Sequence, residues 1–234
     1  MDELMRQVDE LYERAIFNGE YDGLPAADRA LDTVEARLLL QRGRILHCRF
    51  LQPHADPPEE SHVDRPESRA EQPGVSHVDP VEELAYFERA ADLFRGAGDE
   101  RGEAEALFWI GCFHQVVRDD NPTAIPFLTQ AADLCRKTGD QLTLSYALRH
   151  LGIAAHMADD YPKARDLLEE STALRRTLNF TAGVAANLVG LIYLAIAQNR
   201  PDDARALAAE ATTLATTSGA TKITEQIEAA RSRI

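Results

Sequence analysis

The chain has 234 residues, of which 44% are hydrophobic and 27% charged, and 39 acidic against 25 basic side chains give it a formal net charge of -14. An acidic surplus of this size repels phosphate backbones, so direct nucleic-acid binding is not expected. The longest uncharged run, residues 181–199, is rich in Ala and is interrupted by Gly183, Asn187 and Gly190. It therefore predicts a buried helix and no membrane span.

The N-terminal end and the cysteines indicate the compartment. Residues 1–14 are densely charged and contain no apolar core of the signal-peptide kind. Cys48, Cys112 and Cys135 lie in apolar helical contexts without CxxC spacing, which predicts buried free thiols and neither a disulfide nor a zinc site. We therefore expect a cytoplasmic protein. Three Lys against 22 Arg, with abundant Ala, are typical of a GC-rich bacterial genome.

The first segment predicts two helices. An amphipathic helix is expected over residues 2–17, with one apolar face formed by Leu4, Val8, Leu11, Tyr12 and Ala15. A second, long helix is expected from Pro25 to residue 50 or 51.

Residues 53–79 have a different composition, with prolines among acids, Ser and His and almost nothing apolar to bury. This predicts a flexible insert of about 28 residues in the turn of a helical hairpin. Three His-x-Asp pairs in it could share a divalent ion, but no rigid scaffold would hold the ligands, so no metal site is predicted. The pairs are His54/Asp56, His62/Asp64 and His77/Asp79.

From residue 98 to residue 219 a two-helix unit recurs three times with a 40-residue period, which is typical of a helical solenoid. The recurring small, large and helix-ending residues are Ala124, Ala164, Ala204; Leu134, Leu174, Leu214; and Gly139, Asn179, Gly219. The predicted helices are 81–95, 99–118, 122–138, 140–158, 162–178, 181–198, 201–218 and 221–234. The first helices of the first two copies, aligned on Gly111 and Gly152, are 41 residues apart, whereas the second helices repeat every 40 residues. We place the extra residue near 115–120.

One copy resembles a tetratricopeptide repeat, through Leu148, Leu151, Gly152, Ala155, Asp160, Tyr161, Ala164, Leu168 and Ser171. The resemblance implies an all-α, right-handed superhelix of antiparallel helix pairs with a concave ligand-binding groove, and it implies no chemistry. The period exceeds the family's usual 34 residues, which suggests extended helices. We expect a single array over 1–234. It comprises N-terminal helices (1–52), the insert (53–79), the second helix of the first hairpin with three full repeats (80–218), and a C-terminal capping helix (220–234).

In such a superhelix the first helix of each pair lines the concave wall, so its polar and aromatic residues are the candidate groove. The candidates are Phe108, Trp109, Gln115, Tyr146, Arg149, His150, His156, Asn187 and Tyr193. An apolar and aromatic floor with a cationic edge fits a peptide or small acid that carries a carboxylate. Alternatively, Trp109 packs between hairpins and Arg149 pairs with Glu169 or Glu170.

No catalytic triad, phosphate loop or HExxH spacing occurs, and no cofactor is predicted. The first hypothesis is therefore a non-enzymatic scaffold that binds a protein segment or peptide in its groove, with a regulatory role. The second is a small-molecule sensor or biosynthetic enzyme that uses the same wall, where His114, Arg118, Arg149 and His150 could converge. The third is a homodimer formed through the apolar helix 181–198. His114 is expected to be a packing residue.

Overall fold

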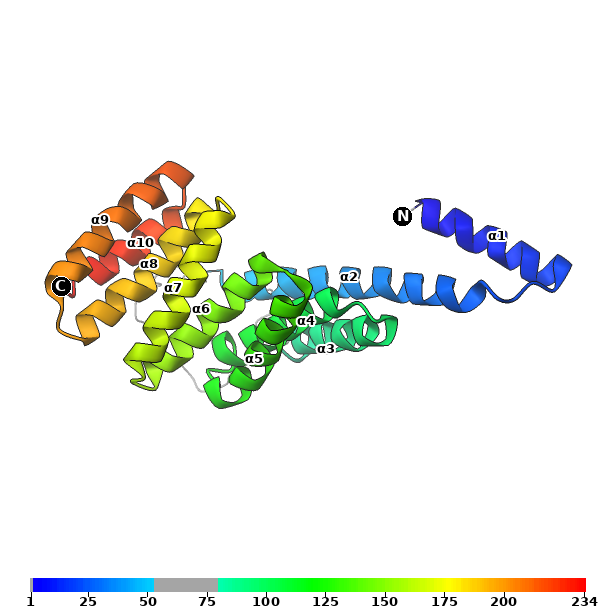
Figure 1. Ribbon diagram of the computed structural model, residues 1–234, viewed down its shortest axis with the longest axis horizontal. Helices are drawn as coiled ribbons and strands as arrows, with labels where there is room; N and C mark the ends of the chain where they lie inside the picture. Colours follow the sequence, from blue (N-terminus) through cyan, green and yellow to red (C-terminus); the bar gives the residue numbers. More distant parts are fainter. Residues whose placement is uncertain (1, 53–79) are drawn as a thin grey trace, which may run out of the picture.

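The computed structural model describes residues 2–52 and 80–234, and within them all regular structure is helical (Figure 1). The predicted insert at 53–79, with its His-x-Asp pairs, lies outside the described residues. The helices are α1 (Asp2–Asn18), α2 (Leu24–Phe50), α3 (Pro80–Ala97), α4 (Glu100–Val116), α5 (Asn121–Thr138), α6 (Gln141–Met157), α7 (Tyr161–Thr177), α8 (Thr181–Ala197), α9 (Pro201–Ser218) and α10 (Thr221–Arg231).

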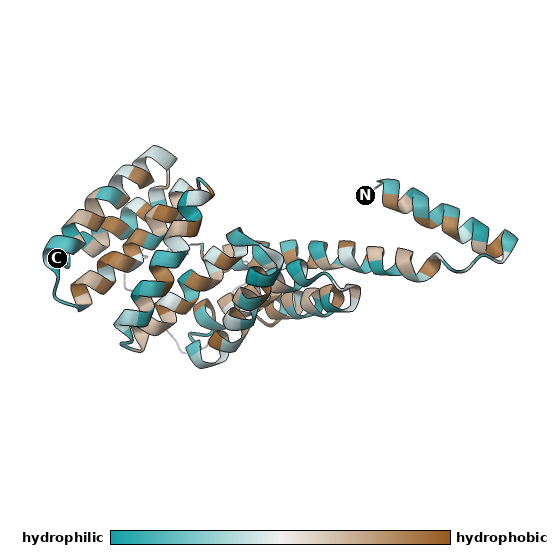
Figure 2. Ribbon diagram, viewed as in Figure 1, coloured by the Kyte–Doolittle hydropathy of each residue, from teal (hydrophilic) through white to brown (hydrophobic). Residues whose placement is uncertain are grey.

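The helices pack as successive antiparallel hairpins, which confirms the predicted solenoid. The pairs are α2 with α3, α4 with α5, α6 with α7 and α8 with α9, and α10 closes the array against α8 and α9. Apolar residues recur along the helices of the array (Figure 2). Each hairpin contributes an apolar surface that the next hairpin covers.

The array curves toward one set of helices. The first helices of successive pairs, α2, α4, α6, α8 and α10, approach one another within 8 Å between Cα atoms. No two of the second helices, α3, α5, α7 and α9, do so over the described residues. The side formed by α2, α4, α6 and α8 is therefore the shorter, concave side, and we call it the inner wall.

Helix ends follow the chemistry that the sequence indicates. Gly139, Asn179 and Gly219 have φ values of 75°, 55° and 66°, the left-handed conformation in which a helix stops. At the other ends, aspartate side chains cap four helices by accepting a hydrogen bond from the backbone N–H three residues on. These caps are Asp99, Asp120, Asp140 and Asp160.

Small residues let the two helices of a hairpin approach closely. Ala124, Ala164 and Ala204 are completely buried. A Cβ atom added at Gly152 would lie 3.0 Å from the Leu168 side chain and 3.4 Å from the Ala164 carbonyl oxygen. A Cβ atom added at Gly111 would lie 2.7 Å from the Leu128 side chain and 3.3 Å from the Ala124 carbonyl oxygen, so a methyl group would force Leu128 to move there and would be tightly packed at Gly152.

Hydrogen bonds locate the extra residue of the first copy. The Asp120 N–H donates to the carbonyl of His114, six residues back. The equivalent Asp160 N–H donates to Ala155, five residues back, and Arg200 repeats the shorter spacing with Ala195. The insertion therefore lies between residues 114 and 120, as predicted.

The second helices are joined across repeats by a ladder of ion pairs on the outer side. Arg136 of α5 lies 3.2 Å from Glu170 of α7, and Arg176 of α7 lies 2.6 Å from Glu210 of α9. Both rungs are solvent-exposed, so each contributes less than about 1 kcal/mol. Their 40-residue spacing keeps the hairpins in register.

Two expectations are corrected. Cys112 and Cys135 are buried, but Cys48 is exposed, because it lies on a side of α2 that no other described helix covers. The third hypothesis used helix α8 as a dimer surface, but this helix is enclosed by α6, α7, α9 and α10. It is therefore a core helix of the array, and its apolar surface is used within one chain. No helix of the described residues has the length and apolar character needed to cross a bilayer.

Gly139→Ala should destabilise the array by about 1 kcal/mol, because Ala pays a steric penalty in the left-handed conformation. The matched control is Gly96→Ala, which lies within α3 with nothing within 4 Å of the added carbon. This control should stabilise the protein by about 0.5 kcal/mol through helix propensity. Urea unfolding measures both, and equal stabilities of the two variants would contradict the assigned helix stop.

Candidate functional site

The inner wall is held together by side chains that cross from one first helix to the next. Cys112 of α4 has its Sγ atom 3.8 Å from Nε2 of His47 on α2 and 3.9 Å from Nε2 of His150 on α6. Arg149 of α6 donates from Nη1 to the carbonyl oxygen of Ala186 on α8, at 2.9 Å. These contacts place Cys112, His150 and Arg149 on the concave side.

The cysteine contacts belong to a longer line of polar groups. Nδ1 of His47 lies 2.8 Å from Oε1 of Glu83, and both side chains are buried. On the other side, Oε1 of Gln115 lies 2.5 Å from Nδ1 of His150, and Nε2 of Gln115 donates to the His150 carbonyl oxygen at 3.1 Å. We call Glu83, His47, Cys112, His150 and Gln115 the polar thread. It runs across three hairpins and gives each buried group a partner.

Burial decides the protonation states within the polar thread. Burial, with the nearby Glu83 carboxylate, raises the pKa of the Cys112 thiol to about 12. Burial, with the positive charges of Arg149 and Arg175, lowers the pKa of His150 to about 3. At neutral pH the thiol is therefore protonated and the His150 imidazole is neutral.

Glu83, His47 and Cys112 follow one another in the order of a carboxylate, a base and a nucleophile. Thiol catalysis requires a thiolate that substrate can reach. Here all three side chains are buried and the thiol holds its proton. The arrangement therefore serves packing and hydrogen bonding between hairpins. Enzymes that use such a triad expose the nucleophile, which this fold does not.

A buried arginine organises the next part of the array. Arg175 of α7 is 1% exposed, and it donates from Nη1 to the Gly183 carbonyl oxygen at 2.8 Å and to Oδ1 of Asn187 at 2.9 Å. Its Cζ atom lies 4.7 Å from the centre of the Tyr146 ring and 5.5 Å from that of Phe180. The arginine thus joins α6, α7 and α8 without a carboxylate, and its Nη2 atom has no hydrogen-bond partner.

Burial and the neighbouring charge of Arg149 lower the pKa of Arg175 to about 10, so the guanidinium stays charged at neutral pH. Its position in the last turn of α7 offsets part of the desolvation, because helix C-termini attract cations. The aromatic rings add cation–π attraction.

Several predicted groove residues point into the array. Asn187 is completely buried and donates from Nδ2 to Oγ of Ser171 at 2.8 Å, so it cannot meet a ligand in the groove as predicted. Phe108 and Gln115 are also buried. His156 packs edge-on against Tyr161 of α7, with ring centres 5.8 Å apart.

The remaining candidates are partly open. Trp109 is half-buried and stacks on Phe87 at 5.6 Å, which is the packing role that we held as the alternative. Tyr146 and Tyr193 are half-buried, and Arg233 lies over the Tyr193 ring.

Arg149 does not form either of the ion pairs that we considered as alternatives. Glu169 instead lies 3.8 Å from Arg165, and Glu170 pairs with Arg136. Among the described residues no carboxylate lies within ion-pair distance of Arg149, whose one hydrogen bond is to a backbone carbonyl. Burial lowers the pKa of this half-buried guanidinium.

The residues proposed for an enzyme do not converge. His114 stacks on Phe127 with ring centres 5.7 Å apart, which agrees with its predicted packing role, and Arg118 lies over Phe113. His150 instead contacts Cys112 and Gln115. The described residues also contain no group of three or more side chains suited to a metal ion.

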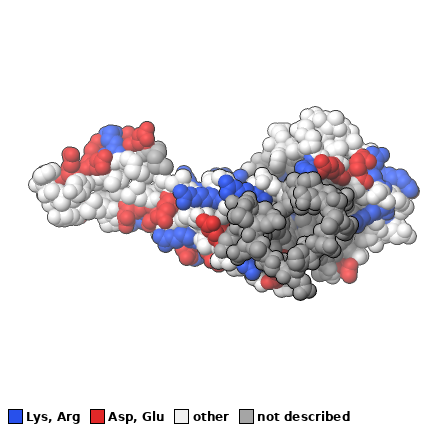
Figure 3. All heavy atoms as spheres, turned by 180° about the vertical axis from the view of Figure 1, so that it is seen from behind, with Lys and Arg blue, Asp and Glu red and all other residues white. Residues whose placement is uncertain are grey.

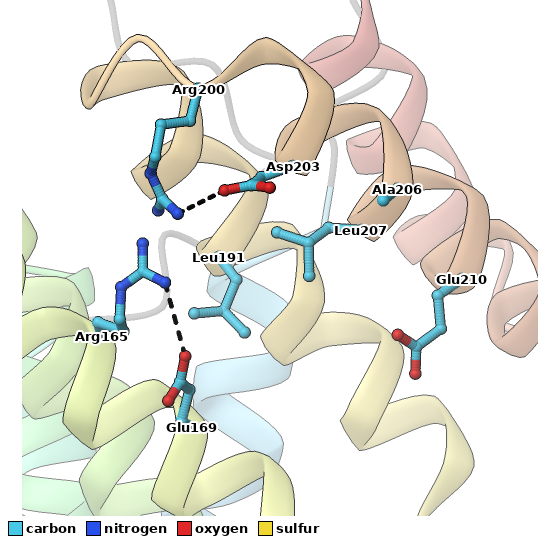
Figure 4. A pocket seen from close by; sticks show the side chains of 8 residues that line it. All are labelled: Arg165, Glu169, Leu191, Arg200, Asp203, Ala206, Leu207 and Glu210. Atoms are coloured by element: carbon cyan, nitrogen blue, oxygen red, sulfur yellow. Dashed lines mark hydrogen bonds and ion pairs between the residues drawn. The ribbon is translucent and has the colours of Figure 1, made fainter.

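A pocket of ≈ 370 Å³ lies on the outer side, between α7 and α9 and above Leu191 of α8 (Figure 4). Arg165 and Arg200 both donate to Oε1 of Gln198, at 2.9 and 2.7 Å. They also pair with Glu169 and Asp203, as the figure shows. Both arginines that line this pocket therefore form an ion pair with a carboxylate, unlike Arg149 on the inner wall.

Sequence reasoning missed His47, Glu83 and Arg175. Two of these polar residues interrupt apolar helical faces, since His47 continues the buried stripe of Ala36 and Leu40, and Arg175 follows Leu168 by seven residues. A polar residue on an otherwise apolar helical face was the sequence signal that could have identified His47 and Arg175 as buried polar residues. Their partners lie 36 residues or more away, or on the next helix, so spacing alone could not pair them.

The polar thread should make stability depend on pH. His150 is neutral when folded but takes up a proton below about pH 6.5 when unfolded, so stability is full above that pH and falls as the pH drops toward 3. At pH 5 the loss should be about 2 kcal/mol. Urea unfolding at pH 7.5 and pH 5 should show this extra loss in the native chain and not in His150→Gln; equal losses would contradict it.

The thiols should differ in reactivity. Iodoacetamide at pH 8 should modify Cys48 in the folded chain and leave Cys112 and Cys135 intact, because burial raises the pKa of both to about 12. Mass spectrometry should therefore count one adduct before unfolding and three after. Rapid modification of Cys112 in the folded chain would disprove its structural role.

A comparison with protein-family models agrees with the antiparallel helix pairs of the structure. A family model described as tetratricopeptide repeat matches residues 113–177, which span the end of α4, the whole of α5 and α6, and α7. A search of curated proteins finds no match to this chain. The matched segment is the centre of an array in which the same hairpin geometry continues on both sides. Residues 113–177 are therefore tetratricopeptide repeats at the centre of this helical array.

Proposed function

We propose that this chain is a non-enzymatic scaffold whose inner wall binds a peptide or a segment of another protein. The family supports a role in protein interaction. The observation that carries the proposal is Arg149, a half-buried cation on the concave side with no acidic partner among the described residues.

A half-buried charge without a counter-ion is unfavourable, and a carboxylate supplied by a partner would relieve it. The neighbouring surface suits the rest of a peptide, because Trp109 and Tyr146 are half-buried aromatic rings on α4 and α6. Aromatic and arginine side chains are the residues that most often dominate binding energy in protein interfaces. The expected ligand is therefore a segment with an acidic group next to an apolar side chain.

The same wall lacks what an enzyme needs. Its thiol is protonated, and its two histidines are engaged in hydrogen bonds within the polar thread. Binding without chemistry fits a regulatory or assembly role. The buried free thiols Cys112 and Cys135 fit a reducing compartment, so we place this role in the cytoplasm.

A random peptide-display library tests the proposal. Peptides selected on the native chain should be enriched in acidic residues or bind through their C-terminal carboxylate. Arg149→Gln should weaken them 10- to 100-fold, roughly the loss of one charge-assisted hydrogen-bonded pair. The matched control is Arg136→Gln, which removes a guanidinium from the outer ladder and should leave the affinity unchanged.

Titration calorimetry measures both variants. If peptides bind the native chain and Arg149→Gln with equal affinity, they do not bind through Arg149 and the proposed site on the inner wall is wrong.

A further inference from the structure

The N-terminal helices expose more apolar surface than the array. Helix α2 buries one face, with Ala36, Leu40 and His47, against the next helices. On the opposite face Leu24, Leu31, Leu38 and Ile45 recur every seven residues, the spacing of a coiled-coil seam. We call these four residues the α2 seam.

The α2 seam is only partly covered near its start, where Leu24 is 37% exposed and Leu31 is half-buried. The α1–α2 turn brings Leu11 against Gly23, next to the start of the α2 seam. From there α1 diverges from α2 (Figure 1), and Leu38 and Ile45 are 56% and 54% exposed. Helix α1 likewise leaves Tyr12 and Ile16 exposed, at 62% and 58%. Exposed apolar side chains gathered on two consecutive helices are typical of an interaction site.

The charges beside the α2 seam identify its partner. Residues 36–50 contain four arginines and no acid. Arg37 and Arg44 lie against Asp99 and Glu105 of the same chain, which leaves Arg42 and Arg49 for a second copy. Residues 2–35, which comprise α1, the turn and the first part of α2, have ten acids and three arginines, a net charge of -7. Acidic side chains accordingly gather at the α1 end in Figure 3, and basic ones lie nearer the array.

We propose that two copies of this chain associate through α1 and α2, with the α2 seams antiparallel. In that orientation the arginine-rich residues 36–50 of each copy lie against the acidic end of the other, and the apolar residues of the two copies cover each other. A parallel pairing would instead set the two arginine-rich segments side by side. The contact is the same on both copies, so it closes as a twofold dimer of four helices.

Light scattering on the full chain, coupled to size exclusion, tests the dimer. The native chain should have twice the mass of one chain, and Leu38→Glu and Ile45→Glu should each halve it. Both positions are solvent-exposed, so the variants should keep their helix content, which circular dichroism checks. The matched control is Ile125→Glu, an exposed apolar residue of α5, which should stay dimeric.

A monomeric native chain would overturn the proposal, as would dimeric Leu38→Glu and Ile45→Glu variants.

Cross-linking separates a second copy from closure of α1 onto its own α2. One chain carries Met5→Cys and Cys48→Ser, and it is mixed with the native chain, whose exposed thiol is Cys48. A bifunctional maleimide should join the two chains into one product of twice the mass. If the chain with Met5→Cys and native Cys48 gives only an internal cross-link, and the mixture gives no inter-chain product, α1 folds back within one chain and the proposal fails.

Discussion

The fold depends on how closely the two helices of each hairpin can approach. Wherever the helices of a hairpin cross, a residue without a side chain or with a single methyl group lies at the contact: Gly111 against Ala124 and Gly152 against Ala164. Close packing there brings the first helices of neighbouring hairpins within reach of one another, while the second helices stay apart. The inner wall is the side on which the first helices of neighbouring hairpins meet.

On the inner wall, polar side chains connect neighbouring hairpins, a role that apolar side chains usually have in a solenoid. The polar thread and the Arg175 cluster replace apolar contacts with directional hydrogen bonds between hairpins. Directional bonds fix the angle between repeats more tightly than non-directional packing does. The central hairpins are thus held at a defined angle, and Arg149 projects from a helix within them.

The fold could be predicted from the sequence because the signals that define it, helix ends and repeat spacing, lie close together along the chain. Gly139 and Asn179 stop helices through their own backbone preferences, and the 40-residue period marks where each hairpin begins. The inner wall was harder to predict. Asn187 has the same helical spacing as a groove residue, but Arg175, on another helix, draws its amide into the core. A partner elsewhere in the chain decides whether a polar residue of a helix faces the groove or the core. Periodicity cannot identify that partner.

The two ends of the array are unlike. At the C-terminal end α10 buries Ile227 and Ala230 and turns Glu225 and Glu228 toward solvent, so the stack of hairpins is sealed there. The apolar end is the one formed by α1 and α2. A repeat protein with two open ends can add copies indefinitely and grow into a filament. In the dimer proposed above, the single apolar end of each copy is covered by the other, so the pairing leaves no apolar end for a third copy.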